Sequence, residues 1–326
     1  MSKPRPHVTL VTLNRPERMN AMSFDVMIPF REALEEISRD NDTRAVVVTG
    51  AGAGFCSGAD LVSAGRVPDI DGLTVPGVSL RAMELLDNVI LTLRKMHQPV
   101  IGAINGPAIG GGLCLALAFD IRLAARSAYF RAAGISNGLS SAELGLSYLL
   151  PRAIGTTRAF EIMLTGRDVD AAEAGHIGLV SRVCADDELL EACYEIAARI
   201  SGLSRVGVEL AKRLLWSGLE AGSLEAHMLH EGVAQLYVRN LTGNFEEMIR
   251  ARKDGRPPVY LDDARQKDAS WLSPSSPRSS PLASSRDARL PSRPAPAALT
   301  ARPVTSALSP RTRYPPASTT MTLASR

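Results

Sequence analysis

The sequence predicts an α/β fold followed by a helical region. Short β-type segments alternate with helical segments up to about residue 130, which is the pattern of an α/β body. From residue 144 onward the apolar residues recur mostly with helical periodicity. With 326 residues, 45% of them hydrophobic and 22% charged, the chain is long enough to bury a core. This length and composition exclude a peptide, a small disulfide scaffold and a fully disordered chain.

The elements of the first half follow from local pattern. Residues 8–13 alternate over β-branched positions and end at Asn14-Arg15-Pro16, as a strand closed by a turn does. The hydroxyl of Ser23 is placed to cap a helix that begins there. Further strands are expected at 44–49, 99–105 and 121–124, and further helices at 78–97 and from Gly111.

The second half is predicted to contain helices at 156–164, 171–175, 186–201, 206–219 and 224–250, with Asp170 as N-cap of the second. Apolar residues line several turns of 206–219, which is more than one small domain edge normally leaves exposed. We therefore divide the chain into a body at 1–203, a helical oligomerisation region at 204–263 and a tail at 264–326.

The tail differs from the rest in composition. Residues 268–326 contain ten of the 21 prolines and thirteen serines, and 264–326 carry a net charge of +8 in a chain of net charge +3. Such a segment cannot bury enough apolar surface to offset chain entropy, so we predict that it is disordered. The net positive charge of the chain therefore comes from the tail, and no nucleic-acid partner is expected.

Cysteine usage and the N-terminus favour a cytoplasmic protein. The cysteines form no C-x-x-C pair and are predicted to be free thiols: Cys56, Cys114, Cys184 and Cys193. The chain runs from MSKPRPH into its first predicted strand without the apolar core of a signal peptide. The uncharged stretch 99–119 is interrupted by Pro107 and a glycine run, so no membrane span is predicted.

Three patterns suggest other kinds of site. The loop GAGAGFCSGAD at 50–60 is similar to a dinucleotide fingerprint, but the third glycine position holds Phe55 or Ser57 in the two frames. The same loop contains a cysteine version of the nucleophile elbow around Cys56, for which a structural thiol is the other interpretation. His227 and His230 lie three residues apart without a third ligand nearby, so no metal site is expected.

The segment AINGPAIGGGLCLA at 103–116 places three glycines at a strand-to-helix junction. Such a junction leaves backbone N–H groups free at a helix N-terminus, which attracts negative charge. Close packing of the strand against the helix is the alternative explanation for the glycines.

Several phrases occur in a fixed order: LNRPERMNAM at 13–22, FCSGADL at 55–61, AINGPAIGGG at 103–112, LTGR at 164–167, AAEA at 171–174 and GLV at 178–180. Together they resemble the crotonase superfamily of enoyl-CoA hydratases and isomerases over residues 8–262. The resemblance implies a spiral of β-β-α repeats followed by a helical trimerisation region, assembled as a trimer or a dimer of trimers. It also implies a bent acyl-CoA thioester as substrate, with neither a metal nor another cofactor.

The resemblance assigns site residues as well. The two backbone N–H groups that hold the thioester oxygen in this family correspond to Ala59 and Gly111. Such fixed donors act where negative charge develops when a proton leaves the carbon next to the thioester. The positions expected to line the substrate site, besides these two, are Arg18, Ala21, Asp60, Leu61 and Gly110.

The acid/base positions depart from the hydratase pattern. Hydratases of this family carry a glutamate two residues beyond the triple glycine and another in a later Pro-Glu phrase, and here these positions hold Cys114 and Gly134. Because water addition needs a base for the water and an acid for the α-carbon, the usual pair is missing.

One carboxylate remains nearby. The segment GLSSAELG at 138–145, followed by LPRAIG at 150–155, resembles the stretch of dienoyl-CoA isomerases that holds a catalytic aspartate, and Glu143 falls on it after a one-residue insertion. The other interpretation of Glu143 is a helix-start carboxylate favoured by the helix dipole.

A single base is sufficient to move a proton between two carbons. We therefore expect enoyl-CoA double-bond isomerisation ahead of hydration. A CoA-thioester-binding homologue without turnover is the competing hypothesis, and a thioesterase that uses Cys56 or Cys114 is a third.

Overall fold

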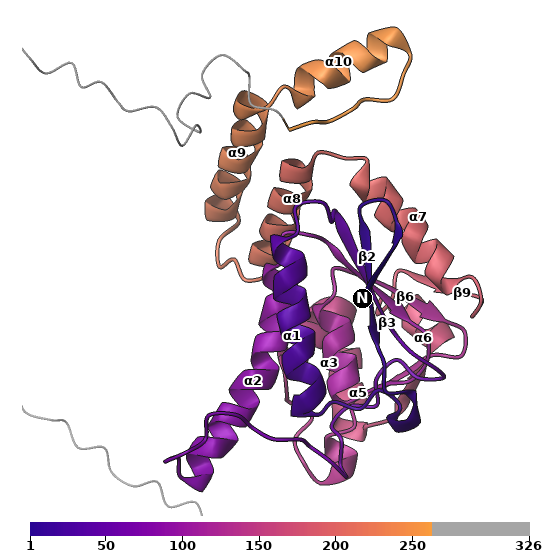
Figure 1. Ribbon diagram of the computed structural model, residues 1–326, viewed down its shortest axis with the longest axis vertical. Coiled ribbons are helices and arrows are strands. Elements are labelled where there is room, and N and C mark those ends of the chain that lie inside the picture. Colours follow the sequence, from indigo (N-terminus) through magenta and orange to yellow (C-terminus); the bar gives the residue numbers. More distant parts are fainter. Residues whose placement is uncertain (263–326) are drawn as a thin grey trace, which may run out of the picture. The chain divides into compact units, whose positions relative to one another are not determined.

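The computed structural model describes residues 1–262. The predicted disorder of the tail concerns residues outside this range and stays a prediction. The α/β class predicted from the sequence is confirmed, and its centre is a six-stranded sheet in the order β1-β2-β3-β4-β6-β9 (Figure 1). The strands are β1 (Ser2–Arg5), β2 (Val8–Leu13), β3 (Ala45–Gly50), β4 (Val100–Ile104), β6 (Ile121–Ala125) and β9 (Arg182–Cys184).

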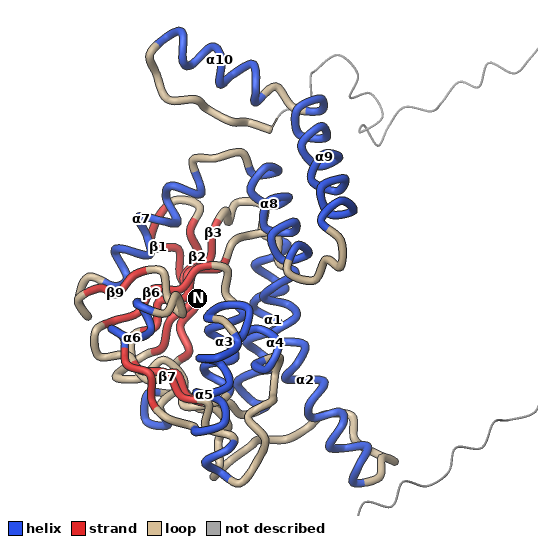
Figure 2. The backbone as a smooth tube through the Cα atoms, turned by 180° about the vertical axis from the view of Figure 1, so that it is seen from behind, coloured by secondary structure: helices blue, strands red, loops and turns tan. Residues whose placement is uncertain are grey.

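All neighbours in this sheet are parallel except the antiparallel pair β1 and β2. Every residue of β3 and β4 is buried. On one side α7 (Leu189–Ser201) packs along the sheet, while α1 (Phe24–Arg39), α2 (Val75–Lys95) and α3 (Gly111–Ala118) group on the other (Figures 1 and 2). A second, three-stranded sheet has the order β5-β7-β8, with β5 (Ala108–Ile109), β7 (Tyr129–Arg131) and β8 (Asp168–Asp170).

Most helices fall close to the predicted positions, whereas no helix was predicted over residues 146–154. They are α1 (Phe24–Arg39), α2 (Val75–Lys95), α3 (Gly111–Ala118), α4 (Leu146–Ile154), α5 (Thr156–Thr165), α6 (Ala171–His176), α7 (Leu189–Ser201), α8 (Arg205–Gly218), α9 (Leu224–Leu241) and α10 (Asn244–Asp254), with 3-10 turns η1 (Pro16–Arg18) and η2 (Ile135–Asn137). Asp170 caps α6 as predicted, accepting the N–H of Glu173 at 2.7 Å.

Two local predictions are wrong. The expected single helix at 224–250 is two helices, because the backbone of Thr242 is extended before Gly243 starts the next one. Ser23 occupies the N-cap position of α1, but its hydroxyl makes no capping bond. It accepts a hydrogen bond from the guanidinium of Arg15 at 3.2 Å instead, so a tertiary partner has replaced the local one.

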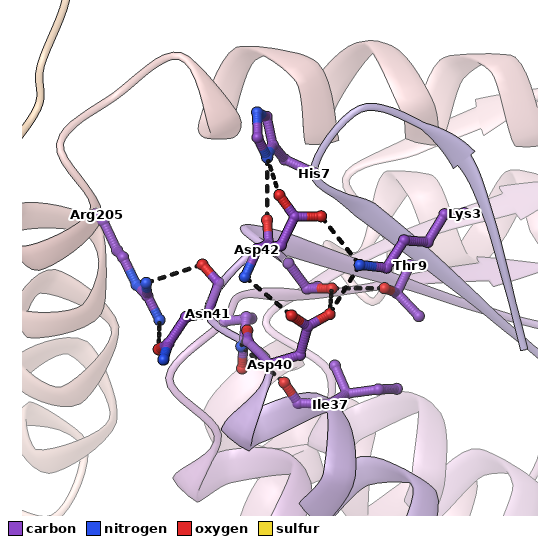
Figure 3. Close-up of polar contacts among 10 residues, drawn as sticks. Lys3, His7, Thr9, Ile37, Asp40, Asn41, Asp42 and Arg205 are labelled. Atoms are coloured by element: carbon purple, nitrogen blue, oxygen red, sulfur yellow. Dashed lines mark hydrogen bonds and ion pairs between the residues drawn. The ribbon is translucent and has the colours of Figure 1, made fainter.

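A polar cluster fastens the N-terminal hairpin to the turn after α1 (Figure 3). The carboxylate of Asp40 accepts the hydroxyl of Thr43 at 2.7 Å and forms an ion pair with Lys3 at 2.9 Å, and the pKa of Asp40 is lowered by these hydrogen bonds. Asp42 pairs with both Lys3 and His7 at 3.0 Å. This cluster joins the start of the chain to the turn after α1, and none of its residues belongs to the predicted substrate site.

α8 is anchored through a buried lysine. The ammonium of Lys212 donates to the carbonyls of Leu93 and Gln98 at 3.0 and 2.9 Å and pairs with Asp120 at 2.9 Å. Asp120 also accepts the indole N–H of Trp216 at 2.7 Å. Burial lowers the pKa of Lys212. Each of the three ammonium N–H donors nevertheless has an acceptor, and these contacts fix α8 on the body.

Beyond this anchor, α8 and α9 expose much apolar surface. No residue of α9 is buried within residues 1–262. The large apolar side chains exposed on the two helices and their connection are Leu215, Leu219, Leu224, Met228, Leu229, Val233, Leu236, Tyr237 and Leu241. Such a surface is typical of an interface between chains.

Three further features concern the cysteines, membrane-spanning helices and metal ligands. All four cysteines are free and buried. Among residues 1–262, none of the helices combines the length and the apolar character needed to cross a bilayer. The described part of the chain also contains no cluster of three metal-ligating side chains, and the His227 ring lies 3.5 Å from the carboxylate of Glu231.

Candidate active site

The loop that follows β3 is held in shape by two asparagines. Asn20, 1% exposed, accepts the N–H of Arg15 at 2.8 Å and donates to the carbonyls of Ala51 and Gly54. Asn105 accepts the N–H of Gly50 at 3.0 Å. The sequence did not indicate the role of either asparagine. Asn20 has a positive φ of 54°, a conformation that asparagine tolerates better than most residues.

Glycines let this loop touch the start of α3. A Cβ atom on Gly112 would lie 2.1 Å from the carbonyl oxygen of Cys56, and one on Gly58 would lie 2.6 Å from that of Ile109. The N–H of Ile109 donates to Cys56 at 2.9 Å. Close packing is therefore one reason for the triple glycine, and it brings the two segments together. The attraction of negative charge to the free N–H groups stays a prediction.

This contact brings together the two segments that carry the predicted donors, Ala59 and Gly111. Within residues 1–262, no carbonyl accepts a hydrogen bond from the N–H of either residue. The peptide groups on both sides of Ala59 are fixed by Met22, whose N–H donates to Gly58 at 2.7 Å and whose carbonyl accepts from Asp60 at 2.9 Å. Two free N–H groups on rigid segments are suited to binding a carbonyl oxygen.

Asp60 stabilises the segment that follows Ala59, the first predicted donor. Its carboxylate is enclosed, with 0% of the side chain exposed, and it pairs with Arg18 at 2.6 Å and Arg15 at 3.1 Å. It also accepts the N–H groups of Val62 and Ser63. The hydrogen bond from Arg18 is the largest influence that lowers the pKa of Asp60. The carboxylate is thus occupied by the protein itself, whereas Leu61 beside it is 82% exposed.

Glu143 lies against the other segment. An oxygen of its carboxylate is 3.6 Å from the position that a Cβ on Gly110 would occupy, next to Gly111. The side chain is half-buried, and burial raises its pKa. Its carboxylate has no hydrogen-bond or ion-pair partner in the described part of the chain. The following residue, Leu144, has a φ of +46° and leads into α4, which packs on α3 (Figure 2).

The two positions that hold glutamates in hydratases are closed in this structure. Cys114 is buried with its thiol 3.6 Å from the backbone carbonyl of Glu143, and burial is the main cause that raises the pKa of the thiol. A Cβ on Gly134 would lie 2.2 Å from the carbonyl oxygen of Ser140. The loop itself fills the space that a second carboxylate would need.

Burial also bears on Cys56. Its side chain is inaccessible, and burial raises the pKa of the thiol to about 11. Because the thiolate is the nucleophile, this environment does not activate the elbow-like motif. The structural interpretation of Cys56 is the better one.

The parallel α/β core matches the fold that the resemblance to the crotonase superfamily implies. The glycine-lined contact with two free N–H groups, near a half-buried carboxylate, is the candidate site for an acyl thioester. A family model described as enoyl-CoA hydratase/isomerase matches residues 5–240, and the chain belongs to this family. The fold predicted by resemblance is thereby confirmed, although the trimerisation role of the C-terminal helices remains a prediction.

Relatives agree with this membership. A probable enoyl-CoA hydratase, echA12, of Mycobacterium bovis is 68% identical over 260 residues, which are 80% of this chain and 91% of the relative. A probable enoyl-CoA hydratase/isomerase from Mycobacterium abscessus is 67% identical with a TM-score of 0.78, covering 80% of this chain and 98% of that one. A monofunctional enoyl-CoA isomerase from M. smegmatis is 62% identical with a TM-score of 0.60, covering 70% and 96%.

Proposed function

We propose that this enzyme of the enoyl-CoA hydratase/isomerase family isomerises the double bond of an enoyl-CoA thioester. The observation that carries the proposal is the unpaired carboxylate of Glu143, which lies against Gly110 next to the free N–H of Gly111, while the position of Gly134 is blocked. Isomerisation needs one carboxylate, because the same group removes a proton from one carbon and returns it to another. Hydration needs two such groups.

In the proposed mechanism, the thioester oxygen of a 3-enoyl-CoA accepts hydrogen bonds from the N–H groups of Ala59 and Gly111. The carboxylate of Glu143 removes a proton from C2, and the electron pair delocalises onto the thioester oxygen as a dienolate. The protonated Glu143 then returns the proton to C4, which yields the 2-enoyl-CoA and the original carboxylate. Loss of one donor of this kind typically costs about 3 kcal/mol of barrier.

The electrostatic environment of Glu143 supports this role. Its pKa is raised by burial, so the carboxylate is a stronger proton acceptor than a solvated glutamate. The helix-start interpretation does not require the side chain to be unpaired or partly desolvated. The relative from M. smegmatis, a monofunctional enoyl-CoA isomerase, supports the same reaction for this chain.

Hydration is the second proposal, favoured by the name of the M. bovis relative. It would require water to be activated without a second carboxylate at Cys114 or Gly134. A CoA-thioester-binding protein without turnover is the remaining alternative.

The rest of the substrate site and the assembly are proposed by analogy with the family. We propose that the CoA moiety lies along Arg18, Ala21, Leu61 and the backbone at Asp60 and Gly110, and that the reaction uses no metal or further cofactor. The apolar faces of α8 and α9 are proposed to form a homotrimer or a dimer of trimers. Cytoplasmic location remains a prediction.

The test is a product analysis with the purified full chain. A 3-enoyl-CoA should be converted to the 2-enoyl-CoA, detected by the conjugated enone absorbance, and the 3-hydroxyacyl-CoA should form far more slowly. Rapid formation of 3-hydroxyacyl-CoA from 2-enoyl-CoA would establish hydration. Retention of acyl-CoA with no product of either kind would establish the binding protein.

A further inference from the structure

Ser141 closes the loop that precedes Glu143. This side chain is 6% exposed. Its hydroxyl accepts the N–H of Ile135 at 3.0 Å and donates to the carbonyl of Ala132 at 3.3 Å. One buried hydroxyl therefore joins the end of the loop to its beginning, nine residues earlier.

Both ends of this loop lie against the same point of the site. The N–H of Gly110 donates to the carbonyl of Arg131 at 2.8 Å. A Cβ on Gly110 would be 3.8 Å from the Cβ of Ala133 and 3.6 Å from the carboxylate of Glu143. The distance between the two ends thus determines where the carboxylate lies relative to the start of α3.

Within residues 1–262, the N–H of Leu139 also closes the loop by donating to the carbonyl of Gly134 at 2.9 Å. Ser141 supplies the side-chain bonds that tie the end of the loop, next to Glu143, to its start. On the far side, the carbonyl of Glu143 accepts the N–H of Leu146 at 2.7 Å and the weak thiol donor of Cys114 at 3.6 Å. The carboxylate itself has no partner there. The other serine of the loop, Ser140, is exposed and bonds only the N–H of Ala142 at 3.0 Å, which is a local contact.

We propose that Ser141 is a positioning residue that holds the carboxylate of Glu143 over the oxyanion site. The inference rests on the proposed base role of Glu143. It concerns geometry rather than chemistry, because the hydroxyl is engaged by two backbone groups and is not available to the substrate. A displacement of about 1 Å of a reacting group can lower a rate about 100-fold.

The test compares Ser141→Ala with the matched control Ser140→Ala in the full-length enzyme. Ser141→Ala should lower kcat on a 3-enoyl-CoA by about 10- to 100-fold with KM nearly unchanged, whereas Ser140→Ala should stay within about twofold. The acid limb of the pH profile should also move to lower pH in Ser141→Ala, because a displaced carboxylate is better solvated. Lower thermal stability with an unchanged kcat would show a merely structural role and overturn the proposal.

A double-mutant cycle separates this proposal from the role of Glu143. If Ser141 acts through Glu143, Ser141→Ala should cause no further loss in a Glu143→Gln background. Full additivity of the two losses overturns the positioning role, whereas wild-type activity of Glu143→Gln overturns the base role itself. Ser141→Cys, which keeps the volume but bonds weakly, provides the same comparison if the alanine variant does not fold, and an unchanged kcat in it also contradicts the proposal.

Discussion

Gly112→Ala is expected to damage the oxyanion site without touching the proposed base. The added Cβ would lie 2.1 Å from the carbonyl oxygen of Cys56, whereas ordinary contacts begin near 3.4 Å. The segments that carry Ala59 and Gly111 must therefore separate by about 1 Å, and misplacement on this scale can cost about 100-fold in rate. Overpacking should also lower the free energy of unfolding by about 1–3 kcal/mol.

Steady-state isomerase kinetics and chemical denaturation measure the two effects. The control is Gly222→Ala, where the structure leaves open space around the new Cβ and the φ is not positive. We expect kcat/KM of Gly112→Ala to fall about 100-fold and the control to behave as wild type. A folded Gly112→Ala enzyme with near wild-type kcat/KM would refute the inference that this contact sets the donor geometry.

Four further outcomes are expected. Cys114→Ala should change kcat by less than about threefold in the same assay, because a buried neutral thiol transfers no proton in this scheme. Lys212→Met should lower the free energy of unfolding by about 3–5 kcal/mol in urea titrations, since it leaves Asp120 without its cation, while a Lys95→Met control at an exposed position should not. Because burial raises the pKa of Glu143, kcat/KM should fall on acidification at a pH above that of a solvated glutamate, as a pH–rate profile would show. Removal of everything after residue 263 should leave acyl-CoA affinity and the oligomeric state unchanged in titration and light-scattering measurements.

The main strands and helices were predictable because their signals are local. The strand β3 is a continuous aliphatic run, and α1 shows a clear apolar stripe, so neither depends on the rest of the fold. Strands of two or three residues, such as β5, β7 and β8, contain too few positions to show a period. The break between α9 and α10 was missed because helical apolar spacing continues across Thr242 and Gly243.

The candidate site likewise has features that local sequence patterns indicate and features that depend on tertiary contacts. The phrases around Ala59 and Gly111 indicated the proposed donors from the sequence, whereas the blocked position at Gly134 depends on a contact with Ser140 that no local pattern reveals. Introducing glutamates at Cys114 and Gly134 should not create a hydratase, since the loop must first open to admit the second side chain.

The role of Glu143 is tested most directly by the turnover of Glu143→Gln on a 3-enoyl-CoA. Glutamine keeps the size of the side chain and removes the proton acceptor, so kcat should fall by about 10²–10⁴ while the Kd for acyl-CoA stays nearly unchanged. That result supports a single carboxylate acting beside the N–H groups of Ala59 and Gly111. Full isomerase activity in Glu143→Gln, with activity abolished in Cys114→Ala, would contradict the account and assign the chemistry to the thiol.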